Sequence, residues 1–190
     1  MLQSEGDNLK LSQLIVMSTQ ISAGMAYLEE KNCILRNLAA RNILVGERFI
    51  CKISNFSSAR IVTRSYDSTE GGIYTYVESG VIIYEDQNYT RIAVKWVAPE
   101  AANNSRFSSR SDVWSFGIVL SEIVTCGSMP YPKLTNKETL DNLIKGYRMP
   151  RPADCPEKLY NIMLNCWSSQ FTEHPSFSSL NQMLENYFSE

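Results

Sequence analysis

The feature that most constrains the fold is an apolar segment at residues 112–124, Asp-Val-Trp-Ser-Phe-Gly-Ile-Val-Leu-Ser-Glu-Ile-Val. Drawn as a helix, it carries apolar side chains almost all round and has no wide polar face. A helix of that kind is buried in the middle of a domain, so other elements must surround it. The segment therefore predicts one domain over residues 1–190, built around a central helix.

Helical periodicity predicts the elements that surround this segment. Ser12 could cap a helix whose apolar residues recur at helical steps of three and four: Leu14, Met17, Ile21, Met25 and Leu28. Three more helices are predicted at about 136–147, 156–167 and 176–188. The predicted fold class is therefore mainly α.

Strand signals are fewer. Residues 43–45 and 49–53 are predicted to form a short β-hairpin, because apolar and β-branched residues flank a turn at 46–48. Residues 61–95 are rich in Gly, Ser, Thr and Tyr without a helical period. We expect a long loop there, with a transient strand at 81–84.

Composition excludes several classes of function. A net charge of −2 without a long Lys/Arg run predicts no nucleic-acid partner. No apolar run approaches a membrane span, and no signal peptide is expected. Five cysteines without a CxxC pair favour reduced thiols and a cytoplasmic protein. His174 is the one histidine in the sequence, which argues against histidine-based triads and His-rich metal sites.

Residues 35–42, Leu-Arg-Asn-Leu-Ala-Ala-Arg-Asn, carry a catalytic frame. The protein-kinase catalytic loop reads His-Arg-Asp-Leu-x-x-x-Asn, with the Asp as base and the Asn as metal ligand. Arg36 and Asn42 keep their positions in that pattern, but Asn37 stands at the base. Residues 55–57 read Asn-Phe-Ser where kinases carry the magnesium-binding Asp-Phe-Gly. A kinase-like frame has lost both of its working acids.

Further motifs stand in the same order as in that family: Lys-Trp-Val-Ala-Pro-Glu at 95–100, Ser-Asp-Val-Trp-Ser-Phe-Gly at 111–117, Gly-Tyr-Arg-Met-Pro at 146–150 and Cys-Trp at 166–167. From about residue 8 to 188 the chain resembles the C-terminal lobe of a Src-type non-receptor tyrosine kinase. It is most similar to the fyn-related kinase branch. The family's N-terminal lobe, with its Gly-rich loop and strand Lys, is absent from this sequence. Residues 61–95 correspond to an extended activation-loop-like segment.

The resemblance implies roles for the residues of the frame. Arg36, Arg41 and the degenerate base Asn37 stand at catalytic positions, and Asn42 and Asn55 at the metal positions. Mg²⁺ favours carboxylate and phosphate oxygens, so two neutral amides predict a poor magnesium site. We therefore expect no cofactor.

Three structural residues and two tyrosines are also implied by the resemblance. Asp112 matches a buried Asp that holds the backbone of the catalytic loop. The family's Glu at the position of Glu100 pairs with an Arg, and this chain has His174 at the position of that Arg. An imidazole cannot form the bidentate clamp of an Arg, so we expect a weakened brace. Tyr84 and Tyr89 are candidates for phosphorylation by another kinase, with exposed, unregulated loop tyrosines as the alternative.

Three functions are left open by these observations. The first is a catalytically inactive, pseudokinase-type lobe that binds proteins, such as tyrosine-containing peptides or another kinase. The second is a fragment of an active non-receptor tyrosine kinase that transfers the γ-phosphate of ATP to tyrosine with magnesium. The third is a decayed product without a stable role, because a lobe normally covered by a partner exposes apolar surface.

Overall fold

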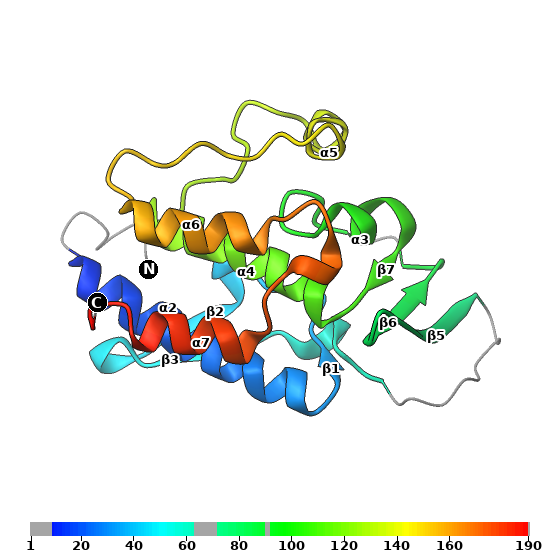
Figure 1. Ribbon diagram of the computed structural model, residues 1–190, viewed down its shortest axis with the longest axis horizontal. Helices are drawn as coiled ribbons and strands as arrows, with labels where there is room; N and C mark the ends of the chain where they lie inside the picture. The colour runs from blue at the N-terminus through cyan, green and yellow to red at the C-terminus, as the bar shows by residue number, and fades with distance from the viewer. Residues whose placement is uncertain (1–8, 63–71, 90–91, 190) are drawn as a thin grey trace.

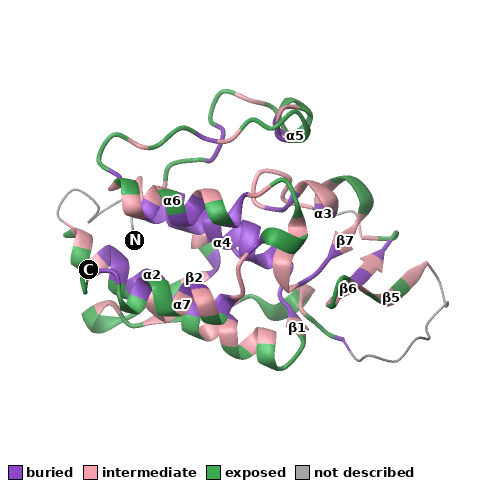
Figure 2. Ribbon diagram, viewed as in Figure 1, coloured by how far each residue is buried: buried purple, intermediate pink, exposed green. Residues whose placement is uncertain are grey.

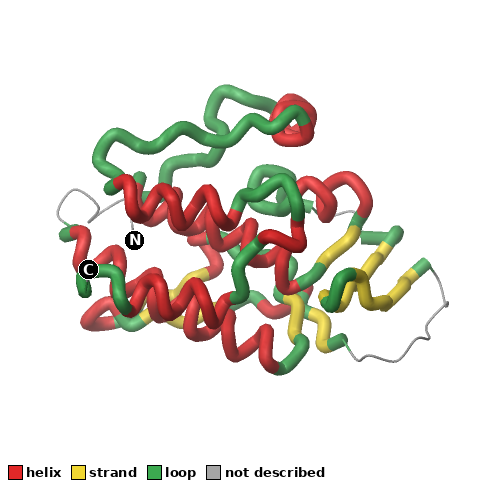
Figure 3. Tube along the Cα trace, in the orientation of Figure 1, coloured by secondary structure: helices red, strands yellow, loops and turns green. Residues whose placement is uncertain are grey.

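The computed structural model describes residues 9–62, 72–89 and 92–189 of the chain. This described part is mainly helical, with small antiparallel sheets (Figures 1 and 3). The helices are α2 (Leu11–Glu30), α3 (Pro99–Asn104), α4 (Ser109–Val124), α5 (Asn136–Ile144), α6 (Glu157–Cys166) and α7 (Phe177–Glu185). None of the described helices has the length and apolar character needed to cross a membrane.

Helix α4 forms the centre of the molecule, as its apolar sequence predicts. Every residue from Ser111 to Ile123 is buried (Figure 2). Helix α6 packs against α4, and α2 packs against both α7 and α4. The helix begins with a reciprocal pair of hydrogen bonds between Ser108 and Ser111, which satisfies backbone N–H groups that would otherwise be orphaned.

The predicted β-hairpin is present. Strand β2 (Ile43–Val45) pairs antiparallel with β3 (Cys51–Ile53), with Leu44 opposite Lys52. The connection is longer than predicted because residues 47–49 form a 3₁₀ turn, with Arg48 at a φ of 54°. A second pair, β1 (Cys33–Ile34) with β4 (Arg60–Ile61), flanks this hairpin in sequence. Residues 35–42, here called the catalytic loop because they match that motif, therefore lie between β1 and β2.

The predicted strand at 81–84 lies within a longer strand, but the prediction of a loop is wrong for residues 73–78 and 85–86. Strands β5 (Ile73–Glu78), β6 (Val81–Asp86) and β7 (Arg106–Phe107) form an antiparallel sheet in the order β5-β6-β7. Ser79 and Gly80 make the turn, both with positive φ. The aromatic and β-branched residues of β5 and the Ser-Gly turn are hairpin signals. The prediction of a loop rested on the absence of a helical period and did not use them.

Helix boundaries differ from prediction by a few residues. Helix α2 begins at Leu11 rather than after Ser12, and the Lys10 backbone N–H donates to Gln13 Oε1 at its start. Helix α5 ends at Ile144, and Gly146 follows with a φ of 91° that ends the helix at little steric cost. Helix α3 and strand β7 were not predicted, because segments so short carry too little periodicity.

The contact between α4 and α6 depends on Gly117. A Cβ atom at this position would lie 2.5 Å from Trp167 Nε1 and 2.8 Å from Cys166 Cβ. Both neighbours are buried, so neither can move aside freely. The absence of a side chain at Gly117 is what lets the two helices approach.

Gly117→Ala is expected to lower the free energy of unfolding by about 1–3 kcal/mol, because the added methyl overpacks this contact. The better helix propensity of Ala offsets about 1 kcal/mol of the steric cost at most. Urea unfolding followed by tryptophan fluorescence measures the change. Gly46→Ala is the control, since its Cβ would meet nothing closer than the Ile50 carbonyl oxygen at 3.7 Å. Equal stability of the two variants would contradict the prediction.

Candidate functional site

A buried carboxylate of α4 holds the backbone of the catalytic loop. Asp112 accepts hydrogen bonds from the backbone N–H of Leu35 at 2.7 Å and of Arg36 at 2.9 Å. Burial raises the pKa of Asp112 to about 7, and the two backbone hydrogen bonds oppose that shift. Arg36 has a φ of 64°, a left-handed conformation that costs a non-glycine residue about 1–3 kcal/mol. The Asp112 hydrogen bonds help hold this strained turn in place.

A second carboxylate of α4 binds further along the loop. Glu122 Oε2 accepts a hydrogen bond from the backbone N–H of Ala40 at 2.9 Å. The side chain is buried, and burial raises its pKa. Sequence reasoning missed Glu122, because no motif marks it and its contact spans 82 positions of the chain.

Asn37, at the predicted base position, carries no charge and accepts a hydrogen bond from a cation. Its Oδ1 accepts a hydrogen bond from Arg41 Nη2 at 3.3 Å, and its carbonyl oxygen accepts one from Asn42 Nδ2 at 2.8 Å. The Arg41 guanidinium lies 4.5 Å from the centroid of the Trp96 ring. The amide oxygen can accept a hydrogen bond but is a far weaker base than a carboxylate.

The structure brings the two predicted metal positions together. Asn55 Nδ2 donates to Asn42 Oδ1 at 3.3 Å, and Ser57 Oγ donates to Asn55 Oδ1 at 2.8 Å. Both amide oxygens therefore already accept hydrogen bonds. Within the described residues no group of three or more His, Cys, Asp or Glu side chains could hold a metal ion. Neutral amides engaged with one another do not fit Mg²⁺, which prefers carboxylates.

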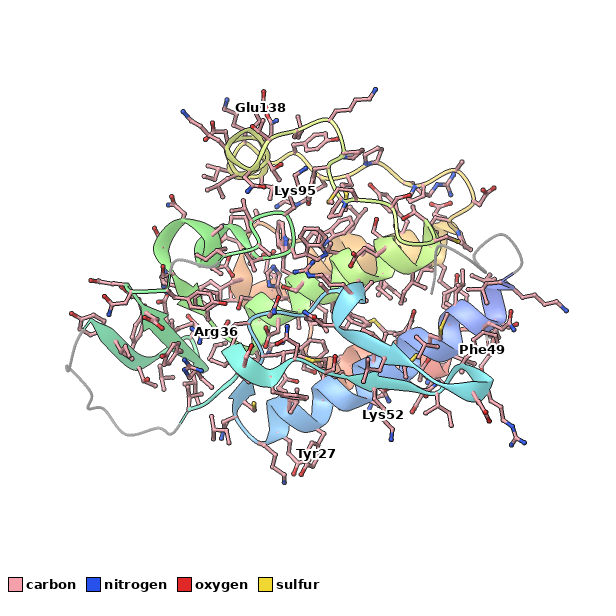
Figure 4. All side chains as sticks on the ribbon, turned by 180° about the vertical axis from the view of Figure 1, so that it is seen from behind. Tyr27, Arg36, Phe49, Lys52, Lys95 and Glu138 are labelled. Carbon is pink, nitrogen blue, oxygen red and sulfur yellow. The ribbon has the colours of Figure 1, made fainter. Side chains whose placement is uncertain are left out.

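Arg36 occupies a pocket of its own, here called the Arg36 pocket and formed by Ser58, Tyr84, Asp86, Tyr89 and Phe107. Its side chain is buried, and Nε donates to the Ser58 carbonyl oxygen at 2.6 Å. Nη1 forms an ion pair with Asp86 Oδ2 at 3.4 Å. Burial lowers the pKa of Arg36. Figure 4 shows Arg36 beside the β5–β6 hairpin.

Both predicted phosphorylation candidates lie in the Arg36 pocket. Tyr84 is 6% exposed, and its hydroxyl donates to Asp86 Oδ2 at 3.4 Å. Tyr89 is half-buried, and its hydroxyl shares a 3.0 Å hydrogen bond with Ser58 Oγ. Neither side chain stands free in solvent, which an exposed loop tyrosine would do. Asp86, the residue that ties Tyr84 to Arg36, was not singled out from the sequence.

His174 binds backbone carbonyl oxygens rather than Glu100. The His174 ring lies 2.9 Å from the Arg110 carbonyl oxygen through Nδ1 and 3.0 Å from the Ser168 carbonyl oxygen through Nε2. Burial lowers the pKa of His174 and raises that of Glu100. Among the described residues, Glu100 Oε1 has no hydrogen-bond partner. His174 therefore joins the start of α4 to the turn before α7.

Comparison with known proteins agrees with this arrangement of motifs. The sequence pattern described as protein tyrosine and serine/threonine kinase matches residues 1–184, almost the whole chain. The chain belongs to this kinase family.

Curated relatives within the kinase family are similar over nearly all of the chain. Tyrosine-protein kinase SRK2 of Spongilla lacustris is 50% identical over 98% of this chain and 47% of its own length. SRK3 of the same sponge is 46% identical over 97% of this chain and 50% of its own length. Human tyrosine-protein kinase FRK is 44% identical over 96% of this chain and 34% of its own length. The chain thus spans half or less of each of these relatives.

The pKa of Asp112 predicts a dependence of stability on pH. Its pKa of about 7 lies above the ordinary value of 3.8, so between these values the folded state binds more protons than the unfolded state. The stability from this group is complete below pH 3.8 and is lost as the pH rises through 7. We expect the free energy of unfolding of the native chain, minus that of Asp112→Asn, to fall between pH 5 and 8 by up to about 1.4 kcal/mol per unit.

Urea unfolding at several pH values measures this difference. His174 and the other titrating groups are present in both proteins, so their effects cancel. Asp154→Asn, at an exposed position, should track the native chain across the whole range. If the curve of Asp112→Asn also ran parallel to that of the native chain, the proposed linkage would be wrong.

Proposed function

We propose that this chain is a catalytically inactive C-terminal lobe of a Src-type tyrosine-kinase domain, which acts by binding other proteins. The observation that carries this proposal is the pairing of Asn55 with Asn42. The side chains at the metal positions satisfy each other, and the Ser57 hydroxyl occupies the remaining amide oxygen. An ion entering here would have to break these hydrogen bonds and would gain no carboxylate in return.

Asn37 supports the same conclusion. General-base assistance is worth about 10²–10⁴-fold in rate, so losing the carboxylate would raise the barrier by roughly 3–5 kcal/mol. The Arg41 guanidinium beside the Asn37 oxygen lowers the basicity of that amide further. The missing base carboxylate and the missing metal carboxylate are at two separate residues, Asn37 and Asn55. One nearby side chain could therefore not replace both.

Protein binding is supported by what remains at the substrate end of the loop. Arg41 stacks on Trp96, and Lys95 Nζ donates to the Tyr131 carbonyl oxygen at 3.0 Å. Next to Tyr131 is a mostly apolar cavity of about 640 Å³. Its lining includes Met129, Pro130, Pro132, Leu134, Tyr147 and Pro150. Cations beside an apolar hollow suit a peptide that carries acidic and aromatic residues.

The alternative is a fragment of an active tyrosine kinase that uses ATP and magnesium. It is favoured by the names of the relatives and by Arg36 and Asn42, which keep their motif positions. The two proposals differ in one measurable quantity, the transfer of phosphate to tyrosine.

We expect no phosphate transfer when the purified chain is mixed with Mg-ATP and a tyrosine peptide, because both acids are missing. Transfer of radiolabelled phosphate is the measurement, with an active tyrosine kinase as positive control. A thermal shift with Mg-ATP tests nucleotide binding separately, and no shift is expected. Transfer that Asn37→Ala abolishes would establish the alternative instead.

Binding of an acidic, tyrosine-containing peptide should weaken about tenfold in Trp96→Ala or Arg41→Ala. Each change removes one partner of a cation–π pair worth about 1 kcal/mol, and with it the side chain that the peptide would contact. Fluorescence anisotropy of the labelled peptide measures the affinity. Lys52 lies far from Lys95 in Figure 4, so Lys52→Ala is the matched control and should bind the peptide as the native chain does. Equal affinity of all the variants would exclude this surface as the binding site.

A further inference from the structure

Strand β5 forms an outer edge of the three-stranded sheet. The strand order is β5-β6-β7, and within the described residues no strand pairs with the outer side of β5. At the opposite edge, β7 is two residues long and contacts α3 and α4. Figure 1 shows β5 on the side of the sheet away from α4. An unpaired row of backbone N–H and C=O groups is a template for another strand.

The hydrogen bonds within the hairpin show which groups of β5 face outward. The Gln87 backbone N–H donates to the Gly72 carbonyl oxygen at 3.1 Å, directly beyond the first residue pair of the β5–β6 ladder. Hydrogen-bonded pairs alternate with non-hydrogen-bonded pairs along an antiparallel ladder. Ile73, Thr75 and Val77 therefore direct their backbone N–H and C=O groups away from β6. These outward groups are here called the β5 edge.

The β5 edge lacks the features by which proteins usually prevent such edges from associating, which are Pro, Lys, bulges and very short strands. The sequence of β5, Ile-Tyr-Thr-Tyr-Val-Glu, contains neither Pro nor Lys. All six of its residues are described, and they pair with β6 without a bulge. Its one charged residue, Glu78, forms an ion pair with Arg106 of the same chain. Tyr74 and Val77 are 38% and 39% exposed. An aromatic and β-branched strand is thus left open to pairing.

The sequence of β5 is complementary to a second copy of itself. Two β5 strands can run antiparallel about a two-fold axis at Thr75. In this register Thr75 faces Thr75 of the second copy, Tyr74 faces Tyr76, and Ile73 faces Val77. Threonine pairs, aromatic pairs and β-branched pairs are cross-strand pairs that stabilise sheets.

Backbone and charge agree with the same register. The residues of the β5 edge face one another in it, so the N–H of each can donate to a C=O of the second copy. Glu78 of each copy lies at the opposite end of the shared ladder, and its charge is already offset by Arg106. Two copies therefore meet without like charges opposite each other.

We propose that the β5 edge is a self-association surface, through which two copies of this chain join their three-stranded sheets into one continuous sheet. The assembly closes as a dimer, because the pairing uses the free edge of each copy. It also supports a hairpin that β7 holds through two residue pairs, since a two-stranded ribbon alone is marginally stable. The proposal concerns the sheet and holds whether or not the chain transfers phosphate.

Sedimentation velocity of the full chain at increasing concentration tests the dimer. We expect a reversible equilibrium between monomer and dimer. Thr75→Lys should raise the dissociation constant about tenfold, because it removes the threonine pair and sets two like charges opposite each other. Ile144→Lys, at an exposed apolar residue of α5, is the control and should associate like the native chain. A native chain that stays monomeric, or a Thr75→Lys dimer as tight as the native one, would overturn the proposal.

A charge exchange tests the register. Thr75→Glu alone should weaken the dimer as Thr75→Lys does. An equimolar mixture of the two variants should form a mixed dimer about tenfold tighter than either variant forms alone, because opposite charges then face each other. A substitution that merely disrupts the hairpin would not be rescued by mixing. A mixture that associates no better than its components would exclude this pairing.

The native chain gives a test that needs no variant. Amide hydrogen exchange followed residue by residue by NMR should slow at least about tenfold for Ile73, Thr75 and Val77 at concentrations where the dimer forms. Tyr74 and Tyr76, whose N–H groups face β6, should change less. Equal changes at all five amides would contradict the proposed ladder.

A second apolar surface is the alternative contact between copies. Ile61 on β4 is 78% exposed, so Ile61→Lys tests that surface by the same sedimentation measurement. The dimer through the β5 edge should tolerate Ile61→Lys. Loss of the dimer in Ile61→Lys, with Thr75→Lys unaffected, would show that the copies meet elsewhere and that the proposal is wrong.

Discussion

The two hydrogen bonds from the backbone of Leu35 and Arg36 to Asp112 are the interaction on which the rest of the site depends. They join the loop to α4, the most buried element of the described chain, and they support the left-handed turn at Arg36. That turn directs the Arg36 side chain into its pocket, while the main chain continues to Asn37. The positions of the Arg36 side chain and of Asn37 thus follow from one buried carboxylate.

Glu122 holds the other end of the loop in the same way, by accepting a hydrogen bond from a backbone N–H. Two acids of the same helix, ten residues apart in the sequence, each accept backbone N–H groups of the loop. Neither contact involves the side chains at the base or metal positions. The contacts that hold the loop are therefore separate from the side chains at the predicted base and metal positions, and a substitution at those positions leaves these contacts in place.

Features with a local signal could be predicted from the sequence. The uniform apolar character of residues 112–124 indicated a buried central helix, and the motif spacing indicated the neighbourhood of Asn42 and Asn55. Features that depend on contacts between distant residues could not be predicted. Arg36 and Asp86 are 50 positions apart, and Glu122 lies 82 positions from Ala40. The β5–β6 hairpin lies between these cases, because a strand was predicted at 81–84 while β5 and the Ser-Gly turn fell in a segment interpreted as a loop.

The hydrogen bond from Asn55 to Asn42 also bears on how this chain can evolve. An Asp at position 55 alone would replace a donor by an acceptor and place two oxygens, one of them charged, against each other. The Ser57 hydroxyl would then be the one hydrogen-bond donor left to that carboxylate in the present arrangement. An Asp at this position would therefore cost stability unless a cation bound with it. Position 55 is for that reason coupled to position 42, and the two side chains constrain each other's replacement.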